Sequence, residues 1–261
     1  MAENSQWRTK FFFMAGLCKP RAWLKLGTLF LLLAALAAAG RLFALSVLVK
    51  MFNVPPPILP DALYAKTIER RHQENLPLLQ MGKPIVIAVV AAEDRRFYEH
   101  HGIDGLGALR AMIDNFKAGR LVEGGSTITQ QLAKTTFLDL REKTANRKMQ
   151  QLILAWELED KYPKDRILEA YLNEVYFGNG SYGIEAASHF YFGEDARQLD
   201  LAQAAFLAGL VQAPSQNGLL SHRKQAIARQ REILTKIGAE NLATAAEVKK
   251  SMEEKLNFVD K

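Results

Sequence analysis

Residues 149–178, MQQLILAWELEDKYPKDRILEAYLNEVYFG, carry two runs of apolar residues at helical spacing. The first run has four apolar side chains at positions i, i+3, i+4 and i+7, namely Met149, Leu152, Ile153 and Trp156. The second run repeats the pattern until a glycine ends it, with Ile167, Leu168, Tyr171, Leu172 and Val175 on one face. This periodicity predicts two amphipathic α-helices, each with one face turned towards a core.

Other stretches after Pro60 favour the same fold class. The small and apolar segment 199–210 and the Arg/Gln/Ile-rich segment 223–237 predict further helices. The run PIVIAVVAA, residues 84–92, is compatible with a strand or a buried helix, because periodicity does not separate short apolar runs. We therefore expect a mainly α domain, and we find no internal repeat in it.

The distribution of charge excludes one broad class of function. The chain has 261 residues, 34 of them Lys or Arg and 28 Asp or Glu, for a formal net charge of +6. Seven basic residues and one acidic residue precede Met51, so the part before Met51 holds the whole excess. The remainder is neutral and gives no basis for a nucleic-acid partner. The single cysteine, Cys18, excludes an intramolecular disulfide and a multi-cysteine metal site.

A hydrophobic segment near the N-terminus predicts a membrane anchor. Residues 26–40, LGTLFLLLAALAAAG, carry no charge, and apolar character resumes after Arg41. A bilayer core needs roughly 20 apolar residues as helix. We therefore expect residues 23–49 to span the membrane once, with the basic tail 1–22 in the cytoplasm. A cleaved signal peptide is the alternative.

A proline-rich stretch separates the anchor from the rest of the chain. NVPPPILP, residues 53–60, cannot continue a helix and favours a stiff, extended spacer. We expect a linker over residues 50–65 and one folded domain over residues 66–261. The orientation of the anchor would place that domain outside the cytoplasm.

The first candidate for chemistry is AAEDRRFYEHHGID, residues 91–104. An apolar run ends there in Glu93 and Asp94. A carboxylate at the end of a buried segment is partly desolvated, which suits a general base. Acidic residues after an apolar helix are also common as its solvated end, and the residues alone leave both interpretations open.

The second candidate is GGSTITQQLAK, residues 124–134. Its glycines allow close approach of a ligand to the backbone, and its hydroxyl and amide groups are unusually dense for packing. A Ser/Thr-capped helix start would explain Ser126 or Thr127, but not the paired glutamines Gln130 and Gln131.

The third candidate is a cationic stretch around the helix predicted at residues 149–156. Five basic residues contribute to it, namely Lys134, Arg141, Lys143, Arg147 and Lys148. Such a set suits a phosphate or pyrophosphate. Taken alone it would also fit a solvated charge run.

The order of these motifs resembles the peptidoglycan glycosyltransferases, the polymerase modules of bifunctional penicillin-binding proteins and their stand-alone relatives. The matching patterns are E-D-x-x-F-x-x-H-x-G at 93–102, G-G-S-T-I-T-Q-Q-L-A-K at 124–134, R-K at 147–148, K-D-x-I-L-x-x-Y-L-N at 164–173 and G-x-Y-G-I-E-A-A at 180–187. The likeness covers roughly residues 66–252. An S-x-x-K match at Ser221 has no K-T-G partner. We therefore expect a monofunctional member without a transpeptidase module.

The resemblance implies a mainly α, lysozyme-like domain with a membrane-associated second lobe, preceded by one transmembrane helix. It implies that lipid II is polymerised into β-1,4-linked glycan, with release of polyprenyl pyrophosphate, on the outer face of the bacterial cytoplasmic membrane. The implied partners are lipid II, the growing glycan strand, the membrane, and other proteins of cell wall synthesis or division. A divalent cation, Mg²⁺ or Mn²⁺, is a candidate cofactor.

The resemblance also implies roles for individual residues. Glu93 would be the base that deprotonates the acceptor 4-hydroxyl. Further site residues would be Asp94, Arg110, Ser126, Thr127, Gln130, Gln131, Lys134, Arg147 and Lys148, with the cations on the pyrophosphate. Phe137 and Leu138 match the lipid-facing segment of the family.

One position departs from the family pattern. Where R-K-x-x-E has the second acidic residue of the active site, this chain has Gln151. It follows Arg147 by one helical turn, so we expect it to face the same cleft. Glutamine keeps the size of glutamate but cannot share a proton or balance a divalent metal. A catalytically weak or inactive protein that binds lipid II or regulates a polymerase is therefore the alternative function, and a lysozyme-like hydrolase is a third.

Overall fold

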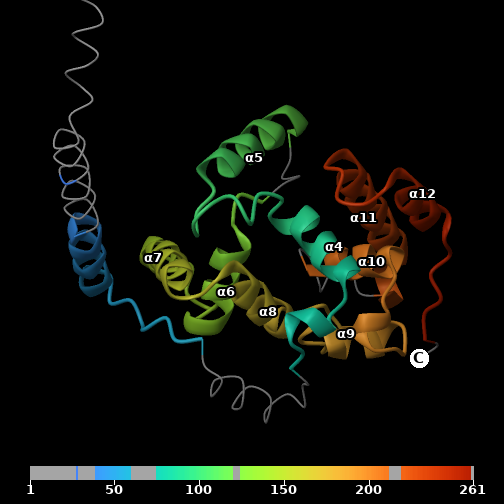
Figure 1. Cartoon of the computed structure of the whole chain (residues 1–261), viewed down its shortest axis with the longest axis horizontal. Coiled ribbons are helices and arrows are strands. Elements are labelled where there is room, and N and C mark those ends of the chain that lie inside the picture. Colours follow the sequence, from blue (N-terminus) through green and yellow to red (C-terminus); the bar gives the residue numbers. More distant parts are fainter. Residues whose placement is uncertain (1–27, 29–38, 60–74, 120–123, 212–218, 260–261) are drawn as a thin grey trace, which may run out of the picture. The chain divides into compact units, whose positions relative to one another are not determined.

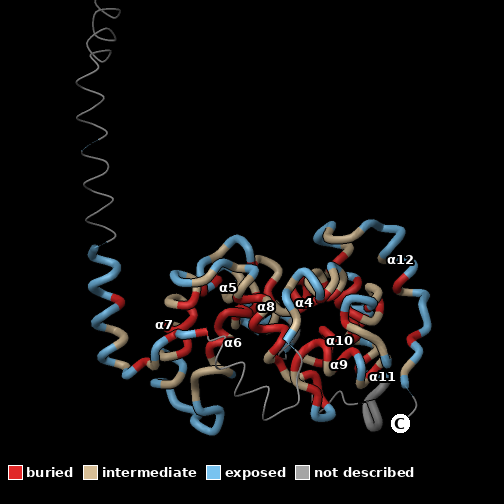
Figure 2. Tube along the Cα trace, turned by 60° about the horizontal axis from the view of Figure 1, so that its bottom comes forward, coloured by how far each residue is buried: buried red, intermediate tan, exposed pale blue. Residues whose placement is uncertain are grey.

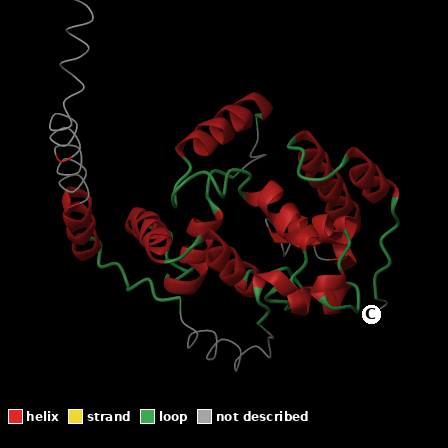
Figure 3. Ribbon diagram, in the orientation of Figure 1, coloured by secondary structure: helices red, strands yellow, loops and turns green. Residues whose placement is uncertain are grey.

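The computed structural model describes residues 28, 39–59, 75–119, 124–211 and 219–259 (Figure 1). The chain divides into two units, Met1–Asn53 and Val54–Lys261. Within the described ranges the regular elements are helices, as the sequence predicts, and Figure 3 shows no strand in them.

The first unit contains a helix over residues 39–51. The predicted basic tail 1–22 and most of the predicted anchor 23–49 lie outside the described residues. In the parts of the chain that the structure describes, no helix combines the length and the apolar character needed to cross a bilayer.

The core of the second unit is built around α4 (Lys83–Glu93) and α10 (Leu201–Val211), which pack against each other and against α11 (Leu219–Ala239). The run at residues 84–92 is therefore a buried helix, one of the two forms that the sequence leaves open. Figure 2 shows α10 almost entirely in the colour of buried residues. The short helix α12 (Ala245–Glu253) packs on α10 and α11.

Three consecutive helices lie beside this core and carry most of the candidate residues. These are α6 (Ile128–Phe137), α7 (Ala145–Lys161) and α8 (Lys164–Glu174), and α6 packs against both of the others. Side chains of Thr127 and Thr144 cap the starts of α6 and α7. Pro163 separates α7 from α8, because proline cannot continue a helix. The two helices predicted between residues 149 and 178 are thus confirmed.

The remaining elements are short or exposed. A 3₁₀ turn, η1 (Leu78–Gln80), precedes α4, and α9 (Ile184–Tyr191) is followed by a second one, η2 (Ala196–Gln198). The helix α5 (Gly105–Ala118) carries a series of exposed large apolar side chains along its length.

Candidate active site

The two neighbouring carboxylates at the end of α4 have different surroundings. Glu93 is the last residue of α4 and is partly exposed. Asp94 is the C-cap, and its side chain is buried. Its oxygens lie 3.0 and 2.9 Å from Nε2 of His100, and Oδ2 accepts a hydrogen bond of 3.0 Å from the backbone N–H of Ile128. Asp94 therefore fastens the start of α6 to the end of α4.

A chain of hydrogen bonds holds the carboxylate of Glu93. Gln131 donates from Nε2 to Oε2 of Glu93 at 2.8 Å, and the hydroxyl of Tyr171 donates to Oε1 of Gln131 at 2.9 Å. Burial raises the pKa of Tyr171 well above its usual value, and the charges of Glu93 and Asp94 raise it further. Tyr171 therefore stays protonated and fixes the amide of Gln131 with its NH₂ group towards Glu93.

The first turn of α6 is held by a glycine that approaches α7 closely. A Cβ on Gly102, which has a φ of +74°, would lie 2.7 Å from the backbone oxygen of Ala155. The carbonyl oxygen of Gly102 accepts a hydrogen bond of 2.7 Å from Oγ1 of Thr127, which itself accepts one from the backbone N–H of Gln130. Thr127 is thus a buried helix cap, as the simpler interpretation of the motif proposes.

A cationic group faces α6 from the first turns of α7. The ammonium of Lys148 lies 3.3 Å from Oγ of Ser126 and 3.4 Å from Oε1 of Gln130. Burial lowers the pKa of Lys148, and the nearby charges of Lys134 and Arg147 lower it further. Three cations therefore share this side of the site. The buried Nε of Arg147 finds no hydrogen-bond acceptor among the described residues.

Gln151 lies between α7 and α6, beside the ammonium of Lys148. It is 4% exposed. Its Nε2 donates to the backbone oxygen of Gln130 at 2.8 Å, and its Oε1 lies 3.3 Å from the ammonium of Lys148. A carbonyl only accepts and an ammonium only donates, so the amide has one orientation that satisfies both. Gln151 thus joins α7 to α6, and a neutral amide moves no proton.

Arg110 approaches the site from α5. It lines a small cavity of about 30 Å³ together with Glu93, Ser126 and Thr127. Lys134 lies one turn after Gln131 on α6 and is partly exposed. Phe137 and Leu138, at the end of α6, are also partly exposed. The structure therefore brings the sequence-predicted residues together at α6, with Asp94, Thr127 and Gln151 turned inward.

Two further contacts around α6 do not follow from the sequence pattern. The apolar periodicity predicts Tyr171 only as a core residue. In the structure its hydroxyl also reaches Gln131 of α6. Glu159, with a side chain 2% exposed, accepts from Oγ1 of Thr129 at 2.5 Å and from Nζ of Lys164 at 2.7 Å. Glu159 thus connects α7 to α6 through Thr129. In the sequence, the second threonine of T-I-T is the one sign of this contact.

The site combines one oriented carboxylate with a group of cations that surround the same helix. This arrangement suits enzymes that transfer a group away from an anionic leaving group. A model of the Transglycosylase family matches residues 61–238. Since that match covers more than half of the chain, the chain belongs to this family, that of the glycosyltransferase module of class A penicillin-binding proteins.

Curated relatives agree with this assignment. Penicillin-binding protein 1A of Aquifex aeolicus (strain VF5) is 42% identical over 172 residues, 66% of this chain and 24% of that protein. Penicillin-binding protein 1F of Bacillus subtilis (strain 168) is 43% identical over 176 residues, 67% of this chain and 24% of that protein. The chain therefore spans about a quarter of the length of these relatives. A crystal structure of penicillin-binding protein 1A from Haemophilus influenzae aligns with 50% of this chain and 16% of its own at 27% identity and a TM-score of 0.35.

Proposed function

We propose that this protein is a peptidoglycan glycosyltransferase that polymerises lipid II into β-1,4-linked glycan strands. The observation that carries the proposal is that α6 contacts both the carboxylate of Glu93 and the cations of α7. Gln131 orients the carboxylate of Glu93, while Gln130 and Lys134 lie on the side of the α7 cations. The helix α6 therefore orients the base at the end of α4 and also lies beside the cations, and an inverting transfer from a pyrophosphate needs both groups in fixed positions.

Glu93 acts as the general base in this mechanism. The acceptor 4-hydroxyl gives its proton to Glu93 while its oxygen forms a bond to the anomeric carbon of the donor. The bond between that carbon and the pyrophosphate oxygen breaks, and the configuration inverts. The hydrogen bonds from Tyr171 to Gln131 and from Gln131 to Glu93 keep the carboxylate in one position during this step.

The cations of α6 and α7 receive the leaving group. Polyprenyl pyrophosphate departs as an anion, so positive charge can take the place of a proton donor. Lys148 has a lowered pKa because of its burial and its cationic neighbours, and an anion beside it would relieve that repulsion. The buried Nε of Arg147 would gain the acceptor that the described residues do not provide.

The donor set does not fit a divalent metal ion at this site. Both oxygens of Asp94 are bonded to His100, and one also to the backbone of Ile128, so of these two neighbouring carboxylates Glu93 alone could serve as a metal ligand. Magnesium and manganese prefer several oxygen ligands, and three neighbouring cations oppose another positive charge. The proposed mechanism therefore uses no metal.

The apolar face of α5 would rest on the outer leaflet of the cytoplasmic membrane. Five apolar side chains form this face, all exposed: Leu106, Leu109, Met112, Ile113 and Phe116. A stripe of this kind on one helix is unusual for a surface in water. Because Arg110 of the same helix lines the site, a membrane-bound α5 would bring the site to the headgroups, where the pyrophosphate of a lipid-linked substrate lies.

A fluorescent label can test the orientation of α5. In the full chain with Cys18→Ser, an environment-sensitive dye on Phe116→Cys should shift to the blue when the protein is reconstituted into phosphatidylglycerol vesicles. The same dye on Leu79→Cys, which is 98% exposed on η1, should not shift. Equal shifts at both positions, or none at Phe116, would remove the membrane role of α5.

The decisive experiment for the activity is polymerisation of purified lipid II by the full chain in detergent. We expect long glycan that lysozyme digests to disaccharide units, with and without EDTA. Binding of lipid II without any product would replace the proposal by the binding or regulatory function. Cleavage of preformed glycan without polymerisation would instead identify a hydrolase.

A further inference from the structure

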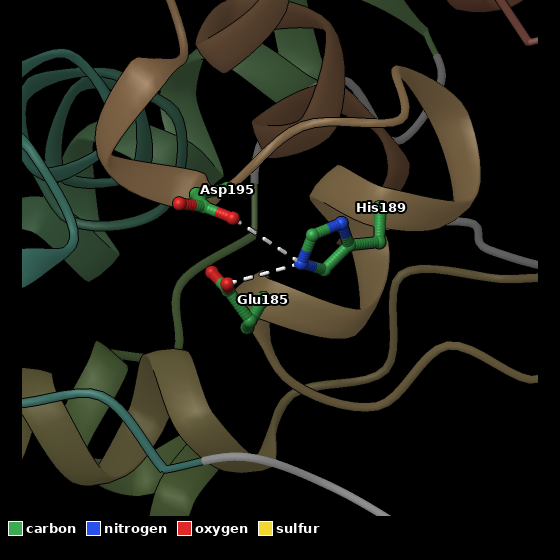
Figure 4. Close-up of side chains that lie close together, drawn as sticks. All are labelled: Glu185, His189 and Asp195. Atoms are coloured by element: carbon green, nitrogen blue, oxygen red, sulfur yellow. Dashed lines mark hydrogen bonds and ion pairs between the residues drawn. The ribbon is translucent and has the colours of Figure 1, made fainter.

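A second group of polar side chains lies along α9 and at the start of η2, and it shares no residue with the site described above. We propose that Glu185, His189 and Asp195 bind a divalent transition-metal ion, with Zn²⁺ as the best match (Figure 4). Imidazole nitrogen and carboxylate oxygen both serve as ligands of zinc, and a water molecule could take the fourth position.

The distances suit an ion at the centre of the group. Nε2 of His189 lies 3.2 Å from Oε1 of Glu185 and 3.6 Å from Oδ1 of Asp195. All three ligand atoms lie within 4.8 Å of one another. Tetrahedral zinc with bonds of about 2.0–2.2 Å separates its ligand atoms by roughly 3.3 Å, so small side-chain adjustments would complete the geometry.

The approach of two carboxylates to one nitrogen is the feature that points to a cation. A ring nitrogen has a single N–H and one direction in which to donate it. His101 also lies between two acids, but it uses both nitrogens, with Nε2 at 2.8 Å from Asp160 and Nδ1 at 3.8 Å from Glu159. At His189 both oxygens converge on Nε2 (Figure 4), and an ion would satisfy all three atoms at once.

The second oxygen of each carboxylate is already held by the protein. Oε2 of Glu185 accepts a hydrogen bond of 2.8 Å from the backbone N–H of Ala196. Oδ2 of Asp195 accepts one of 2.8 Å from Nη2 of Arg197. Such contacts orient metal ligands. The site is thus positioned before any ion arrives.

The local fold explains why the three ligands meet. Glu185 and His189 are four residues apart on α9 and therefore share a face. Gly193, with a φ of +75°, allows the chain to turn back after α9, which returns Asp195 to that face. Glu185 is buried, whereas the His189 side chain is 50% exposed and gives an ion access from solvent.

The test measures metal binding by the full chain without an affinity tag, after treatment with EDTA and its removal. Titration with ZnCl₂ should reveal one site, and a hundredfold excess over Kd should raise the melting temperature by on the order of 5 °C. Co²⁺ should give the absorption bands of a tetrahedral site. His189→Ala and Asp195→Asn should each abolish these signals.

Two controls make the outcome decisive. His101→Ala should keep the zinc response, because His101 cannot direct both acids to one ion. Circular dichroism should show that His189→Ala is folded, as expected for a half-exposed side chain. If wild type and His189→Ala bind zinc equally, or neither does, the group is an ordinary ion pair and the proposal fails. None of these measurements depends on the glycosyltransferase activity.

Discussion

The candidate active site has two sides, here called walls, one rich in buried hydrogen bonds and the other rich in positive charge. The wall formed by the end of α4, by α6 and by Tyr171 of α8 is buried and closely hydrogen-bonded, so it fixes the position of Glu93. The wall formed by the start of α7 is more exposed, and it concentrates positive charge around Arg147 and Lys148. In the proposed mechanism, proton transfer would depend on precise geometry on one wall, whereas leaving-group binding would depend on charge on the other.

The largest expected effect falls on Glu93, the proposed base. Glu93→Gln should lower the polymerisation rate by about 10²- to 10⁴-fold, because the amide cannot accept the proton of the acceptor hydroxyl. Its melting temperature should stay close to that of wild type, since Glu93 is partly exposed. Glu99→Gln, an exposed acid six residues later that pairs with Arg96 at 2.9 Å, is the matched control and should be fully active. An active Glu93→Gln enzyme would contradict the role assigned to the first wall.

Substitution of the adjacent carboxylate, Asp94, should mainly lower stability. Asp94→Asn removes the charge that binds His100 and the start of α6, so unfolding free energy should fall by about 2–3 kcal/mol. Denaturant titration measures this change. Asp165→Asn, which alters an exposed acid that accepts from Tyr98 at 3.1 Å, should cost far less. If Asp94→Asn were as stable as wild type, Asp94 would not be the fastening point between α4 and α6.

These contrasting roles set the limit of what the sequence could predict. The helices were readable because apolar periodicity is local. The partners of the site residues were not, because the fold supplies them from distant positions. Ile128 lies 34 residues after Asp94, and Gln130 lies 21 residues before Gln151. No spacing rule distinguishes a glutamine that binds substrate from one that joins two helices.

The cationic wall should respond to charge and pH, with little effect on stability. Lys148→Ala should lower kcat/KM by about tenfold, since one charge-assisted contact to the pyrophosphate is lost. Lys161→Ala, at the exposed end of the same helix, should have no effect.

The pH dependence of Lys148 has a defined sign. The pKa of Lys148 is lowered in the folded protein, so keeping it charged at neutral pH reduces the free energy of unfolding. This loss disappears as the pH rises from the pKa of the folded protein to the higher pKa of the unfolded chain. Lys148→Ala should therefore be no less stable than wild type at pH 7. The alkaline decline of wild-type activity should lie below the pH at which an ordinary lysine titrates. A decline only at the ordinary lysine value would remove Lys148 from the leaving-group site.

The smallest effect should come from Gln151, which lies where the two walls meet. Glutamate in its place could not donate to the backbone oxygen of Gln130, now 2.8 Å from Nε2, and its charge would oppose that oxygen. The ammonium of Lys148, 3.3 Å from Oε1, would compensate in part. We expect Gln151→Glu to lose about 1 kcal/mol of unfolding free energy, and to change the rate less than tenfold.

The metal response distinguishes the two roles that a carboxylate at position 151 could have. With Lys134, Arg147 and Lys148 close by, a second carboxylate would mainly neutralise those cations, so the rate of Gln151→Glu should remain insensitive to MgCl₂ and MnCl₂. Gln151→Met, which removes both polar contacts of the amide, is the matched control for stability. If wild type is inactive and Gln151→Glu polymerises lipid II, a carboxylate at this position is essential to the chemistry. The natural glutamine would then define a protein that binds lipid II without polymerising it, and the cations alone would not suffice for the transfer.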